Sequence, residues 1–187
     1  MTCQSEGTVE VFIEPVLPQP HLVVVGKSAI ARALVRLAKT AGYRVTAMAN
    51  DARIDTFDKP DQLITQLSWQ QVKTDPSTSI VVATQGEQDE KALELALQQQ
   101  YAYLGFVASH KKRDAVLQYL RDAGADADKV SSIESPAGID IHAKRPEEVA
   151  ISILAAVIMR RNTLPSDFSF TNFDETRVEA GKAAFYV

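Results

Sequence analysis

Apolar and polar positions alternate along this chain in two periods, one typical of buried strands and one typical of amphipathic helices. Short apolar runs bounded by turn residues predict strands at His21–Val25, Arg44–Met48, Ser79–Ala83 and Ala102–Val107, with a fifth near Ile139–Ala143. Apolar stripes at helical spacing predict helices at Ala29–Ala41, Gln88–Gln99, Ser109–Ala123 and Pro146–Arg161. This order of elements predicts an α/β fold of three layers around a mostly parallel sheet.

Three segments show weaker periodicity than this core. Within Asn50–Ser77, apolar side chains at helical spacing predict one short helix around Leu63, Ile64 and Leu67. Thr8–Val16 alternates as a strand does, and the tail after Pro165 is polar apart from Phe168, Phe170, Phe173 and Phe185. We therefore divide the chain into an N-terminal strand segment (1–18), a core domain (19–162) and a C-terminal tail (163–187).

Composition narrows the class of protein. The 187 residues are 45% hydrophobic and 24% charged, as expected for a globular domain with its own core. A net charge of −4 argues against a nucleic-acid partner. The longest apolar run, Val149–Met159, is too short to span a bilayer, and no basic amphipathic stretch favours a membrane surface. A polar start and the single cysteine, Cys3, favour a cytoplasmic protein without disulfides.

The first predicted strand ends in a glycine loop, Gly26-Lys27-Ser28-Ala29-Ile30-Ala31. In a Rossmann unit the first glycine makes the tight turn and the second lets the backbone approach a pyrophosphate; here the second is Ser28. The second predicted strand ends in Ala49-Asn50-Asp51, so the acid expected to hold a ribose is absent or displaced. An NAD(P)-binding oxidoreductase or sensing module and a structural turn without ligand both remain open.

Several motifs in the second half resemble one family. "TQGEQDEKAL" (Thr84–Leu93), "YLGFVASHKKRDAVLQYLRDAG" (Tyr103–Gly124) and "SPAGIDIHAKRPEEVAISILAAVI" (Ser135–Ile158) resemble the C-terminal, Rossmann-like domain of the XdhC/CoxI family, the xanthine dehydrogenase accessory factors. "CQSEGTVEVFIEP" (Cys3–Pro15) is similar to the end of that family's N-terminal domain. The resemblance implies a maturation chaperone without turnover. Such a protein binds the molybdenum cofactor (molybdopterin) and delivers it to a molybdenum hydroxylase apoenzyme.

The chain departs from the family pattern where that pattern has ligand-facing residues. Where the family has Gly-His after the third strand, this chain has Gly86-Glu87. The family's Gly-Ser before the basic residues is replaced by Ala108-Ser109, and its Gly-Ala before the last helix by His142-Ala143. Ser28 replaces the middle glycine of the loop, and Ala49 stands where the family has an aspartate. A third hypothesis is therefore an interaction protein that binds no ligand and pairs with a full-length relative.

The candidate cofactor-binding residues follow three predicted strands. They are Gly26, Lys27, Ser28, Thr84, Gly86, Asp89, Ser109, Lys111 and Lys112. Parallel strands bring their carboxyl ends to one edge, so we expect the basic helix start at Ser109 to form an anion-binding corner with the Gly26 loop. A solvated basic turn is the alternative. We expect that replacing both lysines leaves stability almost unchanged or slightly raised.

No catalytic constellation stands out in the sequence, and no histidine or carboxylate pair has metal-ligand spacing. Cys3 is the one candidate soft ligand for molybdenum or sulfur. The tail phenylalanines and Val9–Ile13 offer apolar surface that favours a homodimer or a complex with a larger relative.

Overall fold

The computed structural model describes residues 19–86 and 88–163. Within them lies one sheet whose strands are β1 (His21–Val25), β2 (Arg44–Met48), β3 (Gln62–Ile64), β4 (Ser79–Val82) and β5 (Tyr103–Phe106). The strands run in the order β3-β2-β1-β4-β5, and every neighbouring pair is parallel. The expected parallel α/β sheet is thereby confirmed, with the Gly26 loop at its carboxyl edge.

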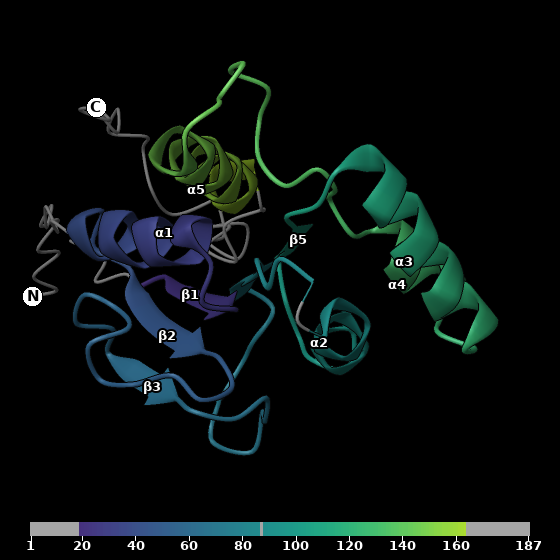
Figure 1. Cartoon of the computed structure of the whole chain (residues 1–187), viewed down its shortest axis with the longest axis horizontal. Coiled ribbons are helices and arrows are strands. Elements are labelled where there is room, and N and C mark those ends of the chain that lie inside the picture. The colour runs from purple at the N-terminus through teal and green to yellow at the C-terminus, as the bar shows by residue number, and fades with distance from the viewer. Residues whose placement is uncertain (1–18, 87, 164–187) are drawn as a thin grey trace, which may run out of the picture.

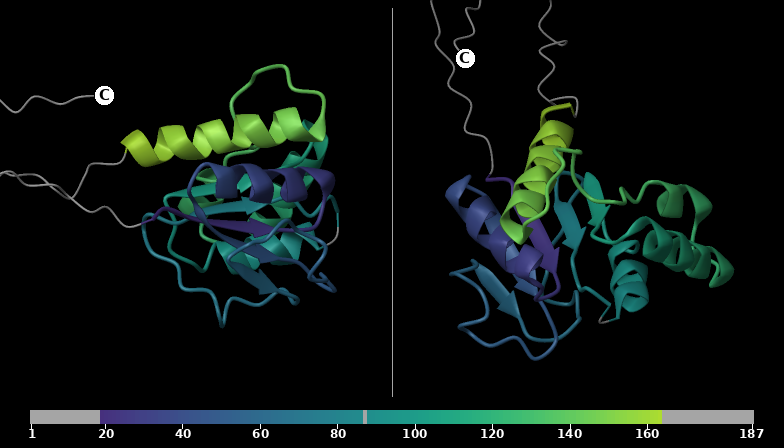
Figure 2. Two further views of the ribbon diagram at one scale, coloured as in Figure 1. Left: turned by 90° about the vertical axis from the view of Figure 1, so that its left-hand side faces the viewer. Right: turned by 45° about the horizontal axis from the view of Figure 1, so that its top comes forward.

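Helices cover both faces of the sheet. They are α1 (Ala29–Thr40), α2 (Asp89–Ala96), α3 (His110–Asp122), α4 (Ala127–Ser131) and α5 (Pro146–Thr163). Figures 1 and 2 show α1 and α5 on one face and α2, α3 and α4 on the other. Among the described residues, no helix has the length and apolar character needed to cross a bilayer.

Each central strand contributes alternate side chains to the two cores. Leu22 and Val24 of β1 pack with the residues of α1 and α5, whereas Val23 and Val25 pack with those of α2 and α3. Every residue of β1, β4 and β5 is buried, so both faces of these strands are covered. Continuous apolar runs are typical of strands that are covered by helices on both faces.

The helix starts agree with the local sequence signals. Ser28 caps α1 and Ser109 caps α3, each through a side-chain oxygen that accepts a hydrogen bond from a backbone N–H. At the start of α5, the carboxylate of Glu148 accepts from the backbone N–H groups of Lys144 and Arg145. These hydrogen bonds hold the pKa of Glu148 at about 2. The four helices predicted at Ala29, Gln88, Ser109 and Pro146 begin within one residue of their observed starts.

Two predicted elements are wrong. Leu63 and Ile64 lie in the edge strand β3, paired with β2, and form no helix. Three apolar residues fit either period, and pairing with β2 decides between them. Residues 139–143 form no strand but an irregular loop, in which the side chain of Asp140 accepts a hydrogen bond from the backbone of His142 at 2.9 Å. The outer edge of β5 is already bonded to the backbone of Glu134, which donates to Leu104 and accepts from Phe106.

Several expectations lie outside the described residues. The strand at Thr8–Val16, the thiol of Cys3 and the phenylalanines of the tail all belong to ranges that the structure does not describe.

A buried histidine makes the stability of the fold depend on pH. His21 opens β1 and is 4% exposed, and its Nε2 lies 2.9 Å from the hydroxyl oxygen of Thr46. Burial, assisted by the positive charge of Arg44, lowers the pKa of His21 to about 4. The imidazole is therefore neutral in the folded protein at neutral pH.

We predict a loss of stability as the pH falls from 6.5 toward 4. In that range the unfolded chain binds a proton at His21 that the folded chain does not, which lowers the free energy of unfolding by about 3 kcal/mol in total. His21→Gln should remove this contribution. Urea unfolding at a series of pH values measures it, and an unchanged pH dependence in the variant would contradict the assignment.

Candidate functional site

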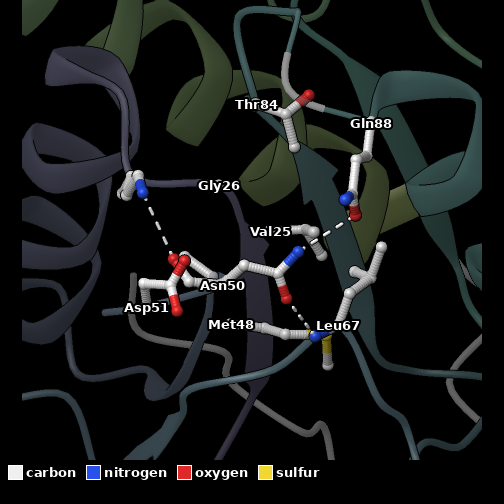
Figure 3. A pocket seen from close by; sticks show the side chains of 10 residues that line it. Val25, Gly26, Met48, Asn50, Asp51, Leu67, Thr84 and Gln88 are labelled. Carbon is white, nitrogen blue, oxygen red and sulfur yellow. Dashed lines mark hydrogen bonds between the residues drawn. The ribbon is translucent and has the colours of Figure 1, made fainter. Parts of the chain in front are cut away.

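A cavity of about 350 Å³ opens at the carboxyl edge of the sheet, where β1, β2 and β4 end. Figure 3 shows its side chains, which come from Val25, Gly26, Lys27, Met48, Ala49, Asn50, Asp51, Leu67, Thr84 and Gln88. The chain order of the strands reverses between β1 and β4, and open parallel sheets bind ligands at such a point. The volume is at the lower end of the range for small-molecule sites.

Position 26 requires a glycine because the backbone at the end of β1 closely approaches the backbone at the end of β4. Its φ is +112°, and a Cβ built on it would lie 2.7 Å from the backbone nitrogen of Thr84. Its N–H donates to the carbonyl oxygen of Met48 at 2.8 Å, which fixes the loop to the end of β2. The absent side chain therefore makes room for the protein's own backbone.

Ser28 faces the helix and does not line the cavity. It is 8% exposed, and its hydroxyl oxygen accepts the N–H of Ala31 at 3.1 Å. In a dinucleotide-binding loop, the free N–H groups of this turn would hold a pyrophosphate. Here one of them is already satisfied by the residue that replaces the middle glycine.

Asn50 joins three segments around the cavity. Its side-chain oxygen accepts the N–H of Leu67 at 2.8 Å, and its side-chain nitrogen donates to Gln88 at 3.0 Å. Its backbone carbonyl accepts from the ammonium group of Lys27 at 3.2 Å. These bonds, drawn as dashed lines in Figure 3, join the loops that follow β1, β2 and β3 to Gln88 at the start of α2. Sequence reasoning noted Asn50 only as part of Ala49-Asn50-Asp51, where the expected acid is absent or displaced, because the partners of Asn50 are distant in the chain.

Asp89 stabilises the loop that follows β4. Its carboxylate is almost fully buried and accepts hydrogen bonds from the hydroxyl of Thr84 and from the N–H of Gly86. The ammonium group of Lys112, from α3, forms an ion pair with the same carboxylate. Gly86, with a φ of +105°, completes the turn. These contacts fix the loop after β4, from which the side chain of Thr84 lines the cavity.

The structure brings only three of the nine candidate residues to the cavity, namely Gly26, Lys27 and Thr84. Ser109 caps α3 by accepting the N–H of Lys112 at 3.4 Å, and Lys111 is exposed beside it. The basic helix start lies at the expected edge of the sheet, but Lys112 points to Asp89 and not to the Gly26 loop. Among the described residues, no three His, Cys, Asp or Glu side chains gather as a metal ion requires.

The family model of the XdhC Rossmann domain matches residues 22–157. The chain belongs to the XdhC family. It is 29% identical over 167 residues to the uncharacterized protein YqeB of Escherichia coli K12, covering 85% of this chain and 30% of that protein. It is also 29% identical over 165 residues to a probable xanthine dehydrogenase subunit of Bacillus subtilis 168, covering 83% of this chain and 47% of that protein.

A solved structure shows the same fold. The crystal structure of a xanthine dehydrogenase from Bacillus halodurans superposes with a TM-score of 0.67 at 21% identity, over 81% of this chain and 45% of that one. This XdhC-family chain therefore spans less than half the length of each of these relatives.

The ion pair of Asp89 corrects one expectation about stability. Replacing Lys112 leaves a buried carboxylate without its counter-charge, so Lys112→Met should lower the free energy of unfolding by about 1–3 kcal/mol. Lys111→Met, one residue away and exposed, should change it by less than about 0.5 kcal/mol. Chemical denaturation of both variants measures the difference, and equal values would contradict the ion pair.

The internal hydrogen bonds of the Ser28 and Asn50 side chains predict weak dinucleotide binding. Calorimetry with NAD and NADP should give a Kd no tighter than about 1 mM, because the glycine and the ribose acid are both replaced. The double variant Ser28→Gly, Asn50→Asp should bind NAD at least about tenfold more tightly. Ser109→Gly removes a matched helix cap outside the cavity and should have no effect. Micromolar binding by the unmodified chain would contradict this interpretation.

Proposed function

We propose that this XdhC-family chain is an accessory factor for a molybdenum hydroxylase of the xanthine or carbon monoxide dehydrogenase type. It holds the molybdenum cofactor or a related nucleotide for an apoenzyme and catalyses no turnover itself. The family supports this proposal, as does the name of the Bacillus subtilis relative. The observation that carries it is the cavity between the ends of β1, β2 and β4.

The side chains of the cavity suit the organic part of the cofactor. Val25, Met48 and Leu67 offer apolar surface to the faces of a flat pterin ring. The carboxylate of Asp51 would accept hydrogen bonds from ring N–H groups, and the ammonium group of Lys27 would meet the phosphate. The lining holds no histidine or cysteine, so these residues would bind the pterin and leave the molybdenum unligated by the cavity. The cofactor supplies redox chemistry in the client enzyme.

The nicotinamide hypothesis has less support at the same site. The N–H of Ala31 is taken by Ser28, and the side chain of Asn50 is committed to Leu67 and Gln88. A pyrophosphate and a ribose would each have to displace an internal hydrogen bond. A ligand with one phosphate and no ribose would leave the hydrogen bonds of Ser28 and Asn50 in place.

Fluorescence of the single tryptophan, Trp69, gives a direct test. Trp69 belongs to the core cluster against which Leu67 packs, and Leu67 lines the cavity, so occupation of the cavity should change the emission of Trp69. We expect molybdopterin to bind and Lys27→Ala to weaken it by about 1–3 kcal/mol, the range for hydrogen bonds to charged groups. No emission change and no binding by calorimetry would contradict the proposal.

Lys111→Ala serves as the matched control for Lys27→Ala. Both variants remove one positive charge from the same edge of the sheet, but Lys111 does not line the cavity. Equal weakening by the two variants would place the anion in a corner between the Gly26 loop and the start of α3, as the sequence hypothesis has it. Weakening by Lys27→Ala alone would support the cavity.

A further inference from the structure

Most of the polar side chains that line the cavity form their hydrogen bonds within the protein. The amide of Asn50 accepts from the N–H of Leu67 and donates to the side-chain oxygen of Gln88. The hydroxyl of Thr84 donates to the carboxylate of Asp89, and Figure 3 shows the Thr84 oxygen turned away from Asn50. Gln88 therefore offers a ligand only the N–H groups of its amide, and Thr84 offers its methyl group.

Asp51 differs from these residues because its carboxylate has no partner. It lines the cavity, is exposed to solvent and accepts no hydrogen bond from any residue in the ranges 19–86 and 88–163. Its own N–H donates to the carbonyl oxygen of Thr65 at 3.1 Å, and its φ of +56° lies in the left-handed region, which aspartate tolerates better than most residues. Figure 3 shows Asp51 and Gln88 on opposite sides of Asn50. Of the side-chain oxygens that line the cavity, those of Asp51 are thus the ones left to accept from a ligand.

A carboxylate of this kind suits a ligand with two N–H groups side by side. Its two oxygens can then accept two parallel hydrogen bonds, an arrangement that is stronger and more specific than a single bond. A 2-amino-4-oxo pteridine has this edge, because its ring N3–H lies beside its 2-amino group. A 2,4-dioxo pteridine has a carbonyl oxygen in place of the amino group, and the lone pairs of that oxygen would face the carboxylate without a proton between them.

We propose that Asp51 determines the specificity of the cavity and selects a 2-amino-4-oxo pteridine over its 2,4-dioxo analogue. The inference rests on the proposed function, because it takes a pterin as the ligand. One carboxylate oxygen of Asp51 accepts from the ring N3–H, and the other accepts from the 2-amino group. A site whose polar group would be left unpaired by the wrong ligand discriminates more strongly than an apolar wall does.

Calorimetry of the full chain with 6-carboxypterin and 6-carboxylumazine tests this assignment, because the two probes differ only in the group at ring position 2. A slightly acidic buffer keeps the ring N–H groups of both probes protonated. We expect the parent chain to bind 6-carboxypterin at least about tenfold more tightly than 6-carboxylumazine.

Asp51→Asn should reverse this order. The new amide accepts from the ring N3–H through its oxygen and donates through its nitrogen to the carbonyl oxygen at position 2, so it matches the 2,4-dioxo ring. Asp51→Ala offers neither group and should bind the two probes about equally. The matched control is Asp55→Asn, because Asp55 is an exposed acid of the same loop that does not line this cavity. It should keep the order of the parent chain.

Every other result overturns the assignment. Equal affinities of the two probes for the parent chain would mean that Asp51 does not meet position 2 of the ring, as expected for a carboxylate that holds a ribose. Equal losses for both probes in Asp51→Asn would indicate a general effect of charge. Both results leave the proposed function standing, provided that 6-carboxypterin binds and Lys27→Ala weakens it. If neither probe binds the parent chain, the proposed function fails together with this assignment.

Discussion

The backbone of β1 meets the backbone of β4 at Gly26, and the site depends on that contact. The N–H of Ala83 donates to the carbonyl oxygen of Val25 at 2.7 Å, and the N–H of Gly26 donates to Met48 at 2.8 Å. Three strand ends are thereby held around one residue with a positive φ and no room for a side chain. The cavity lies beside this junction because the chain leaves β1 in one direction and β4 in the other.

The polar groups around the cavity are bonded mainly to one another. Asn50 uses both atoms of its amide, and Asp89 gathers the hydroxyl of Thr84, the N–H of Gly86 and the charge of Lys112. Buried polar groups are costly when left without partners, so these bonds fix the shape of the wall before any ligand arrives. A ligand that fits this shape loses little free energy to ordering the site.

The cavity and the helix α5 lie on different parts of the domain. No residue of α5 lines the cavity, and α5 covers the face of the sheet opposite to α2. The helix α5 therefore contributes nothing to the walls of the cavity.

The sequence by itself determined the alternation of strands and helices and the parallel sheet, because burial on a strand or helix leaves a local period that the chain displays. The family followed from the resemblance of motifs in the second half of the chain. Only the tertiary structure decided which polar groups line the cavity. Ser28 bonds within its own turn, but the partners of Asn50 lie 17 and 38 residues away, and Lys112 pairs with Asp89 on another helix. It also decided that Gln62–Ile64 is a strand, since pairing with β2 resolves a period that three residues cannot.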